Sequence, residues 1–232
     1  MPSLVQVASN AASATSVTVT LGSPTTAGNC LVVLYGDSAD TANATPSGIT
    51  LGGAADNWAQ VAIEGNSGDH AVSAGWADPG CAGGQTSVVI STTGGSGDHL
   101  FAWVFEFSGL TGTLDVSSGG STVGGFVSAW TSGTTGVTAQ ASEVAFGISC
   151  GASSGTPGLT GPASPWVNEA QQTLAGSSHA KVAICGYQVL SSTGTQAYAG
   201  TASPANTNDT LVFTLKAAAA AGPAYSACMS SM

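Results

Sequence analysis

Basic residues are almost absent from this chain, and their absence excludes whole classes of partner. The 232 residues include two lysines, Lys181 and Lys216, no arginine, and 12 aspartates and glutamates, which gives a formal net charge of −10. Proteins that bind nucleic acid neutralise its phosphates with lysine and arginine, and adsorption to anionic membranes uses the same side chains. The composition therefore predicts no nucleic acid and no membrane among the partners.

Charge of either sign is scarce. Charged residues make up 6% of the chain, whereas about a quarter is usual for a soluble domain. Hydrophobic residues reach 43%, which suffices for a packed interior and argues against disorder. The polar surface must therefore consist mainly of serine, threonine, asparagine, glutamine and glycine. Such surfaces are typical of proteins that work outside cells or in assemblies, and the acidic net charge keeps them soluble.

Long hydrophobic runs and a secretory signal are also missing. No apolar run approaches the roughly 20 residues of a membrane span, and residues 1–6 lack the basic start and apolar core of a signal peptide. We therefore expect synthesis and folding in a cytoplasm. The 5 cysteines are odd in number and include no CxxC pair, which argues against a disulfide framework or a zinc site. Cys30, Cys150 and Cys185 lie in apolar runs and are expected in the core.

Helical periodicity is absent as well, and strand-like runs recur instead. In residues 100–107, Phe101, Trp103, Phe105 and Phe107 fall on every second residue, which is the period of a strand with one face in a core. Clusters of glycine, serine, threonine, asparagine and aspartate separate such runs. The expected strands are 4–8, 16–21, 30–35, 58–63, 71–77, 86–91, 100–107, 126–130, 143–150, 181–190, 196–201 and 210–215.

About a dozen short strands separated by turn signals predict an all-β fold, a two-sheet antiparallel β-sandwich of jelly-roll type. We expect a single β-sandwich domain over residues 1–216, because no linker divides the chain convincingly. The run 31–34 is continuously apolar, as in a strand that is covered on both faces. Residues 217–232 are expected to form a C-terminal tail, which is either an assembly arm or a frayed terminus.

The sequence Ser-Gly-Asp-His occurs twice, and each copy opens a strand-like run. The residues concerned are Asp69, His70, Asp98 and His99. If the runs 71–77, 86–91 and 99–107 formed an up-down-up meander, both loops would lie at the same end of one sheet. Two carboxylates and two imidazoles there could hold a divalent cation or a polar ligand. The alternative is structural: each aspartate accepts backbone N–H bonds within a tight turn, and the histidine caps the strand.

Two tryptophans near polar loops are candidate ligand-binding residues. Asn57 precedes Trp58, and Asn168 follows Trp166 at a distance of two residues. Many β-sandwich modules stack an exposed tryptophan on a sugar ring and bind its hydroxyls with a neighbouring amide or carboxylate. The alternative is that each tryptophan closes the sandwich core at the end of a strand.

Signatures of catalysis are missing from the sequence. No Gly-x-Ser-x-Gly occurs at a strand-to-helix turn, no pair of carboxylates has a spacing that implies acid–base work, and no phosphate-binding loop leads into a helix. Glu106 lies between Phe105 and Phe107, so it is expected to point away from their face and into solvent. The sequence thus predicts a protein that is not an enzyme and needs no cofactor.

Several segments together resemble a family of β-sandwich virion structural proteins of tailed phages of actinobacteria. They are TAGNCLVV at 26–33, DNW at 56–58, WVFEFSGL at 103–110, LD at 114–115 and EVAFG at 143–147, and the likeness spans most of residues 3–216. The resemblance implies a capsid decoration protein or a minor tail or fibre component, made in the host cytoplasm without a signal peptide. Its partners would be other virion proteins and copies of itself, and it supplies no catalytic residues.

A second hypothesis belongs to a different class of function. The chain would then be a carbohydrate-binding module or adhesin that recognises glycans on the host surface through Trp58 or Trp166. The two hypotheses overlap, because a decoration or tail protein can also adhere to host glycans.

Overall fold

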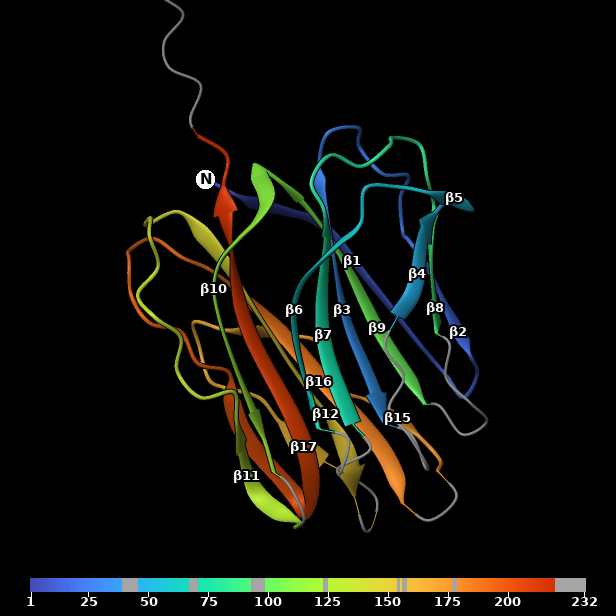
Figure 1. Ribbon diagram of the computed structural model, residues 1–232, viewed down its shortest axis with the longest axis vertical. Coiled ribbons are helices and arrows are strands. Elements are labelled where there is room, and N and C mark those ends of the chain that lie inside the picture. Colours follow the sequence, from blue (N-terminus) through green and yellow to red (C-terminus); the bar gives the residue numbers. More distant parts are fainter. Residues whose placement is uncertain are drawn as a thin grey trace, which may run out of the picture.

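Antiparallel strands are the only regular secondary structure in the part of the chain that the structure describes. A computed structural model describes residues 1–38, 46–66, 71–92, 99–122, 125–153, 155, 158–176 and 179–219. Within these residues no helix occurs, so none is long and apolar enough to cross a membrane. The strands form three sheets, which we call the central, the outer and the large sheet (Figure 1).

The central sheet is built from strands that are distant in sequence. In spatial order it contains β1 (Ser3–Ala12), β9 (Leu100–Ser108), β3 (Cys30–Ser38), β7 (Ala71–Asp78) and β6 (Ala59–Asn66). The outer sheet packs on one of its faces. That sheet contains β2 (Ser16–Thr20), β8 (Ser87–Thr92), β4 (Pro46–Leu51) and β5 (Ala54–Ala55).

The large sheet covers the other face of the central sheet. Its main path is β10 (Leu110–Ser121), β17 (Ala199–Ala217), β12 (Glu143–Ser153), β16 (Ala180–Val189) and β14 (Val167–Asn168). Three short strands join it: β11 (Val127–Thr131) and β13 (Gly158–Thr160) pair with β17, and β15 (Gln172–Leu174) pairs with β16. Figure 1 shows the central sheet between the other two.

The predicted all-β antiparallel sandwich is confirmed, and the strand order supports its jelly-roll type. Strands β1, β9, β3 and β7 lie in one sheet, and β2, β8, β4 and β5 lie in the other. This is the arrangement that results when a long antiparallel ribbon rolls up into two Greek keys. The chain also has a third sheet, because residues 110–217 pair among themselves and cover the face of the central sheet that the jelly roll leaves open.

Strand β3 is buried on both faces, as its continuous apolar run predicts. Every residue from Cys30 to Ser38 is buried. Val32 and Leu34 belong to the core shared with the large sheet, whereas Val33 and Tyr35 belong to the core shared with the outer sheet. Because a strand alternates its side chains, this two-sided burial needs an apolar residue at nearly every position. The predicted burial of Cys30, Cys150 and Cys185 is also confirmed.

The alternating aromatic residues of β9 form the centre of the larger core. Phe105 and Phe107 both contact Phe146 of β12 edge to face, with ring centroids 5.7 Å and 5.6 Å apart. Phe146 in turn stacks on Phe213 of β17 at 5.5 Å. Such pairs stabilise a core by about 0.5–1.5 kcal/mol beyond the area they bury. The aromatic cluster therefore ties the central sheet to the large sheet.

A glycine in β7 makes room for this cluster. A Cβ atom at Gly75 would lie 2.3 Å from Cε1 of Phe213, closer than any real contact. Phe213 is fully buried and cannot move aside without opening a cavity in the core.

We therefore predict that Gly75→Ala lowers the free energy of unfolding by about 1–3 kcal/mol, as overpacking of a core does. The matched control is Gly48→Ala in β4, where a Cβ would meet nothing within 4 Å. Equilibrium denaturation of both variants measures the difference. Equal stability of the two variants would show that Phe213 does not occupy this position.

Candidate functional site

Of the four residues of the two Asp-His loops, only His99 belongs to the part of the chain that the structure describes. Asp69, His70 and Asp98 lie outside the described residues. The strands that follow the loops both pair with β3: Ala71 lies opposite Ser38, and Leu100 lies opposite Asp37. Strands β7 and β9 therefore begin at the same end of the central sheet, as expected. The predicted meander is wrong, however, because β8 belongs to the outer sheet and β3 separates the two strands.

His99 is a buried link between β9 and the segment that precedes β16. Its side chain is 5% exposed. The backbone N–H of His99 donates to Oδ1 of Asp37 at 3.2 Å, and Nε2 lies 2.9 Å from the carbonyl oxygen of Ala175. A carbonyl can only accept, so Nε2 carries the hydrogen. Among the described residues no group of three His, Cys, Asp or Glu side chains could hold a metal ion, so the cation site at these loops stays a prediction.

Trp58 faces inward. It is half-buried and packs against the core between the central and outer sheets, and its Nε1 is buried. The neighbouring Asn57 is exposed, and its backbone N–H donates to Oδ1 of Asp56 at 2.9 Å. This is the packing expected of a tryptophan that closes a core.

Trp166 and Asn168 both contact Tyr198, a residue that was not among the candidates predicted from the sequence. Tyr198 is fully buried on the outward face of the large sheet, and its ring lies 5.0 Å from that of Trp166. Its hydroxyl donates to Oδ1 of Asn168 at 3.1 Å, and Nδ2 of Asn168 donates to the carbonyl of Pro162 at 2.7 Å. Trp166 is half-buried and Asn168 is exposed. The indole of Trp166 and the amide of Asn168 thus both contact Tyr198.

The prediction that Glu106 points into solvent is wrong. Glu106 does point away from the phenylalanine face, but its side chain is 0% exposed, and Thr26 and Asn29 of the loop before β3 bind it. Its Oε1 accepts hydrogen bonds from the backbone N–H of Thr26 at 2.9 Å and from Nδ2 of Asn29 at 2.6 Å. Its Oε2 accepts one from Nε2 of Gln6 at 2.6 Å.

These three donors decide the charge of Glu106. Burial opposes ionisation, but the hydrogen bonds from Gln6, Thr26 and Asn29 outweigh it and lower the pKa of the carboxyl group. The ionised carboxylate therefore fastens β1 and the loop before β3 to β9. No local sequence pattern indicates this role, because all three donors come from segments that are at least 77 residues away.

More acidic groups lie near Glu106. The thiol of Cys81 is surrounded by Glu106, Asp78 and Asp56, and burial together with these carboxylates raises its pKa to about 11. Asp78 is 0% exposed at the end of β7. We call Asp56, Asp78, Cys81 and Glu106 the acidic corner. A thiol with such a high pKa is no nucleophile near neutral pH.

A second charged cluster joins strands of the large sheet. Nζ of Lys216 lies 3.1 Å from Oδ1 of Asp115, and the backbone N–H of Ala139 donates to Oδ2 of Asp115 at 2.5 Å. These contacts outweigh desolvation and lower the pKa of Asp115. Burial raises the pKa of the neighbouring Glu143, which is 0% exposed, and the Asp115 charge adds to the shift. The two carboxyl groups are thus driven toward opposite protonation states.

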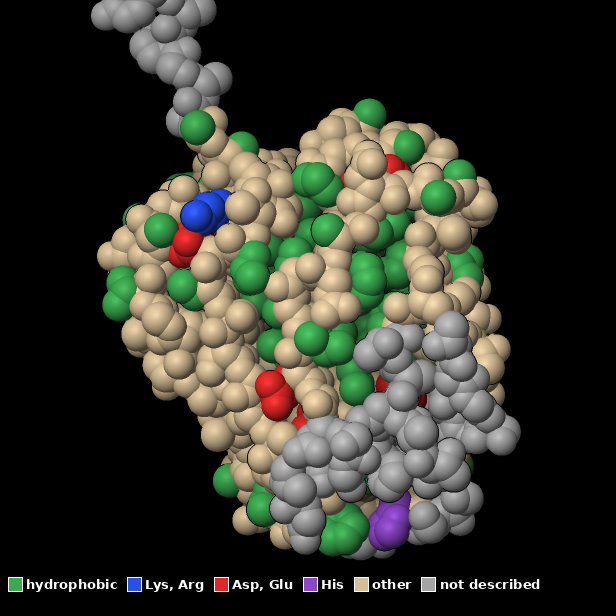
Figure 2. Space-filling model, in the orientation of Figure 1, with side chains coloured by type: hydrophobic (Ala, Val, Ile, Leu, Met, Phe, Trp, Pro, Cys, Tyr) green, Lys and Arg blue, Asp and Glu red, His purple; other side chains and the backbone are tan. Residues whose placement is uncertain are grey.

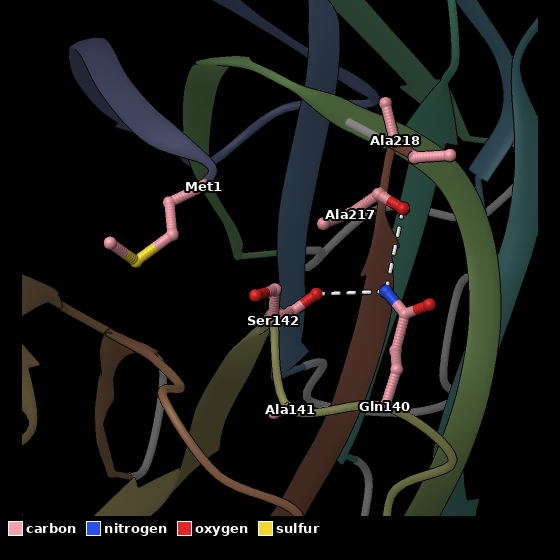
Figure 3. A pocket seen from close by; sticks show the side chains of 7 residues that line it. Met1, Gln140, Ala141, Ser142, Ala217 and Ala218 are labelled. Carbon is pink, nitrogen blue, oxygen red and sulfur yellow. Dashed lines mark hydrogen bonds between the residues drawn. The ribbon is translucent and has the colours of Figure 1, made fainter. Parts of the chain in front are cut away.

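A pocket of about 300 Å³ lies beside this second cluster, where β1 begins and β17 ends. Its lining residues are Met1, Gln140, Ala141, Ser142, Ala217, Ala218 and Ala219. Nε2 of Gln140 donates to the carbonyl oxygens of Ser142 at 2.8 Å and Ala217 at 3.4 Å (Figure 3). No titratable side chain lines this pocket.

No protein-family model, no curated protein and no solved structure matches this chain.

The lowered pKa of Glu106 predicts a pH-dependent stability. A depressed folded-state pKa means that the ionised group stabilises the fold above its ordinary pKa of 4.5, and that this stabilisation disappears as the pH falls through the lowered value. Replacing Glu106 by glutamine removes the charge and turns one acceptor into a donor. We expect Glu106→Gln to lower the free energy of unfolding by about 2 kcal/mol at pH 7, with a smaller loss near pH 3.

Denaturant titrations at both pH values measure this effect. The control is Glu64→Gln, because burial raises the pKa of the half-buried Glu64 and its ionised form does not stabilise the fold. Equal losses from the two substitutions at pH 7 would contradict the role assigned to Glu106.

Proposed function

We propose that this chain is a non-enzymatic structural protein of a phage virion surface, either a capsid decoration protein or a minor tail or fibre component. It acts by packing against copies of itself and against other virion proteins. The observation that carries the proposal is an exterior with even less charge than the composition suggests. Five acidic side chains are 0% exposed: Asp37, Asp78, Glu106, Glu143 and Asp209.

The two lysines add little to the surface charge. Lys181 is 4% exposed, and Lys216 is paired with Asp115. In Figure 2 the visible face has one blue patch next to a red one and a few further red patches, and hydrophobic and uncharged polar atoms make up most of the rest that is drawn in colour. When identical subunits meet through such a surface, few ionic groups must lose their hydration, which is the main penalty for burying charge.

Exposed aliphatic side chains and strand edges provide the contact surface. Val5 on β1, Ile63 on β6 and Val167 on β14 are 48%, 42% and 47% exposed. Strands β1 and β6 are the two edges of the central sheet, and edge strands offer unpaired backbone groups to a neighbouring chain. These edges support association by packing and strand pairing without charged side chains.

The first residue of the chain lies close to the end of β17. Met1 and Ala217–Ala219 line the same pocket, and Figure 1 shows the N-terminus close to the end of β17. The N–H of Ala217 donates to the carbonyl of Ser142, and the N–H of Ala218 donates to that of Gly109. Backbone hydrogen bonds thus hold the chain to the rest of the fold as far as Ala218. We propose that the residues after it form the assembly arm.

A chain that ends at Ala219 should therefore fold normally but assemble poorly. We expect an unchanged circular-dichroism spectrum and thermal midpoint, because every described strand is retained. Incorporation into particles should fall at least about tenfold if the arm supplies about 1.4 kcal/mol or more of contact free energy. Protein content of purified particles measures this. Undiminished incorporation of the shortened chain would reject the arm as a contact.

A second candidate function is glycan recognition, and the cluster of Trp166, Tyr198 and Asn168 favours it. A half-buried indole beside an exposed amide that Tyr198 holds in place is an arrangement that can stack on a sugar and bind its hydroxyls. Trp58 lacks this arrangement, since it packs on the core and its N–H is buried.

A glycan array tests this second candidate. We expect Trp166→Ala to abolish binding to the recognised glycan, and the neighbouring Val167→Ala to retain it. Val167 is a suitable control because it is 47% exposed and carries no ring. A wild-type chain that binds no glycan on the array would eliminate the candidate.

A further inference from the structure

Strand β6 is the more open of the two edges of the central sheet. Its backbone pairs with β7, and among the described residues no other backbone hydrogen bond reaches residues 59–66. At the opposite edge, side chains of β1 bond to neighbouring segments: Asn10 donates to the carbonyl of Thr18, and Gln6 donates to that of Ser23. An edge strand with free N–H and C=O groups is a template for a further strand.

The side chains beside this open edge are apolar. Ile63 is 42% exposed and lies opposite Ala74 of β7, which belongs to the core between the central and outer sheets. Trp58 and Trp76 pack against the same core and are half-buried. Cross-strand partners point to the same side of a sheet and side chains alternate along a strand, so Ile63 and Trp76 share one face. We call Trp58, Ile63 and Trp76 the apolar hollow.

Figure 2 shows hydrophobic side chains gathered in the middle of the visible face, where β6 and β7 lie in Figure 1. Glu64 is the one charged residue of β6. Its side chain points to the other face of the sheet, because a Cβ at Gly119 of β10 would touch its carboxyl group. The hollow therefore suits an uncharged, extended segment that carries apolar side chains at alternate positions.

Residues 220–232 have this character. They contain no charged side chain, and Tyr225, Ala227 and Met229 fall on every second residue, with serine or cysteine between them. An extended strand would place the tyrosine and the methionine on the same face. These residues follow directly on the last described residue of the chain, Ala219.

Strands β17 and β6 run in opposite directions with respect to one end of the molecule. Strand β17 ends there, since the N–H of Ala218 donates to the carbonyl of Gly109. Strand β6 begins at the same end: Ala59 lies opposite Ala77, close to Pro79, and a Cβ at Gly112 of β10 would lie 2.9 Å from Cβ of Pro79. The arm therefore leaves the fold where β6 starts.

This geometry identifies a second copy as the donor of the arm. The strand pairs in the described part of the chain are all antiparallel. To pair in this way with β6 of its own chain, the arm would first have to run the length of this 8-residue strand and then return. At about 3.3 Å per residue the path needs about 53 Å, whereas residues 220–232 span about 43 Å.

We propose that residues 220–232 of one copy add an antiparallel strand to β6 of a neighbouring copy and place Tyr225 and Met229 against its apolar hollow. The inference rests on the assembly role proposed above and names the surface that receives the arm. Backbone hydrogen bonds supply the affinity, and the apolar side chains fix the register. Because the donating and receiving surfaces differ, the contact can repeat from copy to copy around a ring or along an array.

Cross-linking through Cys228 tests this contact. An acceptor chain with Ile63→Cys and Cys228→Ser is mixed with the wild-type chain in concentrated solution and treated with a bis-maleimide, whose spacer tolerates several registers. The other four cysteines are buried. We expect at least about tenfold more donor–acceptor product than with a matched acceptor that carries Val189→Cys and Cys228→Ser, because docking raises the local concentration of the arm thiol at β6.

Val189 is a suitable control because it is 40% exposed but lies on β16, an inner strand of the large sheet. If Ile63→Cys fails to fold, Gln60→Cys on the exposed start of β6 replaces it. Equal yields from the β6 and β16 acceptors would overturn the proposal. So would products that join two acceptors through β6, or a link within one chain when Ile63→Cys is made in a chain that keeps Cys228.

A second measurement separates this contact from the assembly role itself. Ile63→Lys places a charge in the apolar hollow, and we expect it to lower incorporation into particles at least about tenfold, as the chain that ends at Ala219 does, with an unchanged circular-dichroism spectrum. Normal incorporation of Ile63→Lys, together with loss of incorporation on shortening, would reject β6 as the receiving surface and leave assembly through the arm in place.

Discussion

The burial of both faces of the central sheet is the constraint on which the rest of the structure depends. Strand β3 is buried from Cys30 to Ser38, and β9 is buried from Leu100 to Phe107. A sheet of this kind is stable only if another layer covers each face. Burying one large apolar side chain stabilises the folded state by about 1.5–3 kcal/mol, and an exposed side chain does not contribute this free energy. The outer sheet and the large sheet supply those layers, and their edges decide where polar groups meet the core.

Several acidic residues are buried near the ends of strands. Their surroundings shift the pKa of the carboxyl group in different directions. Glu106 is held ionised by three donors, whereas burial raises the pKa of Asp78 to about 6. Because these charges are inside, the exterior is more nearly neutral than a net charge of −10 suggests. A neutral exterior suits repeated contacts between like subunits, and this is the basis of the assembly role that we propose.

Local patterns in the sequence predicted much of the fold. The two-residue period of Phe101 to Phe107 and the apolar run 31–34 identified the buried strands correctly. Strand β10 escaped prediction because its end is rich in glycine and serine, and a Cβ at Gly120 would lie 2.3 Å from the carbonyl of Thr131. The roles of Glu106 and Tyr198 also escaped, since their partners come from distant segments. Contacts between distant segments produce no periodic pattern of residue types in the sequence.

Native-state hydrogen exchange of β3 tests the two-sided burial most directly. If both faces are covered, the amides of Val32 to Tyr35 open only when the whole chain unfolds, and they exchange more slowly than those of β2, which alternates buried and exposed residues. The protection of β3 should then equal the global free energy of unfolding measured with denaturant. Exchange of β3 as fast as that of β2 would contradict this account.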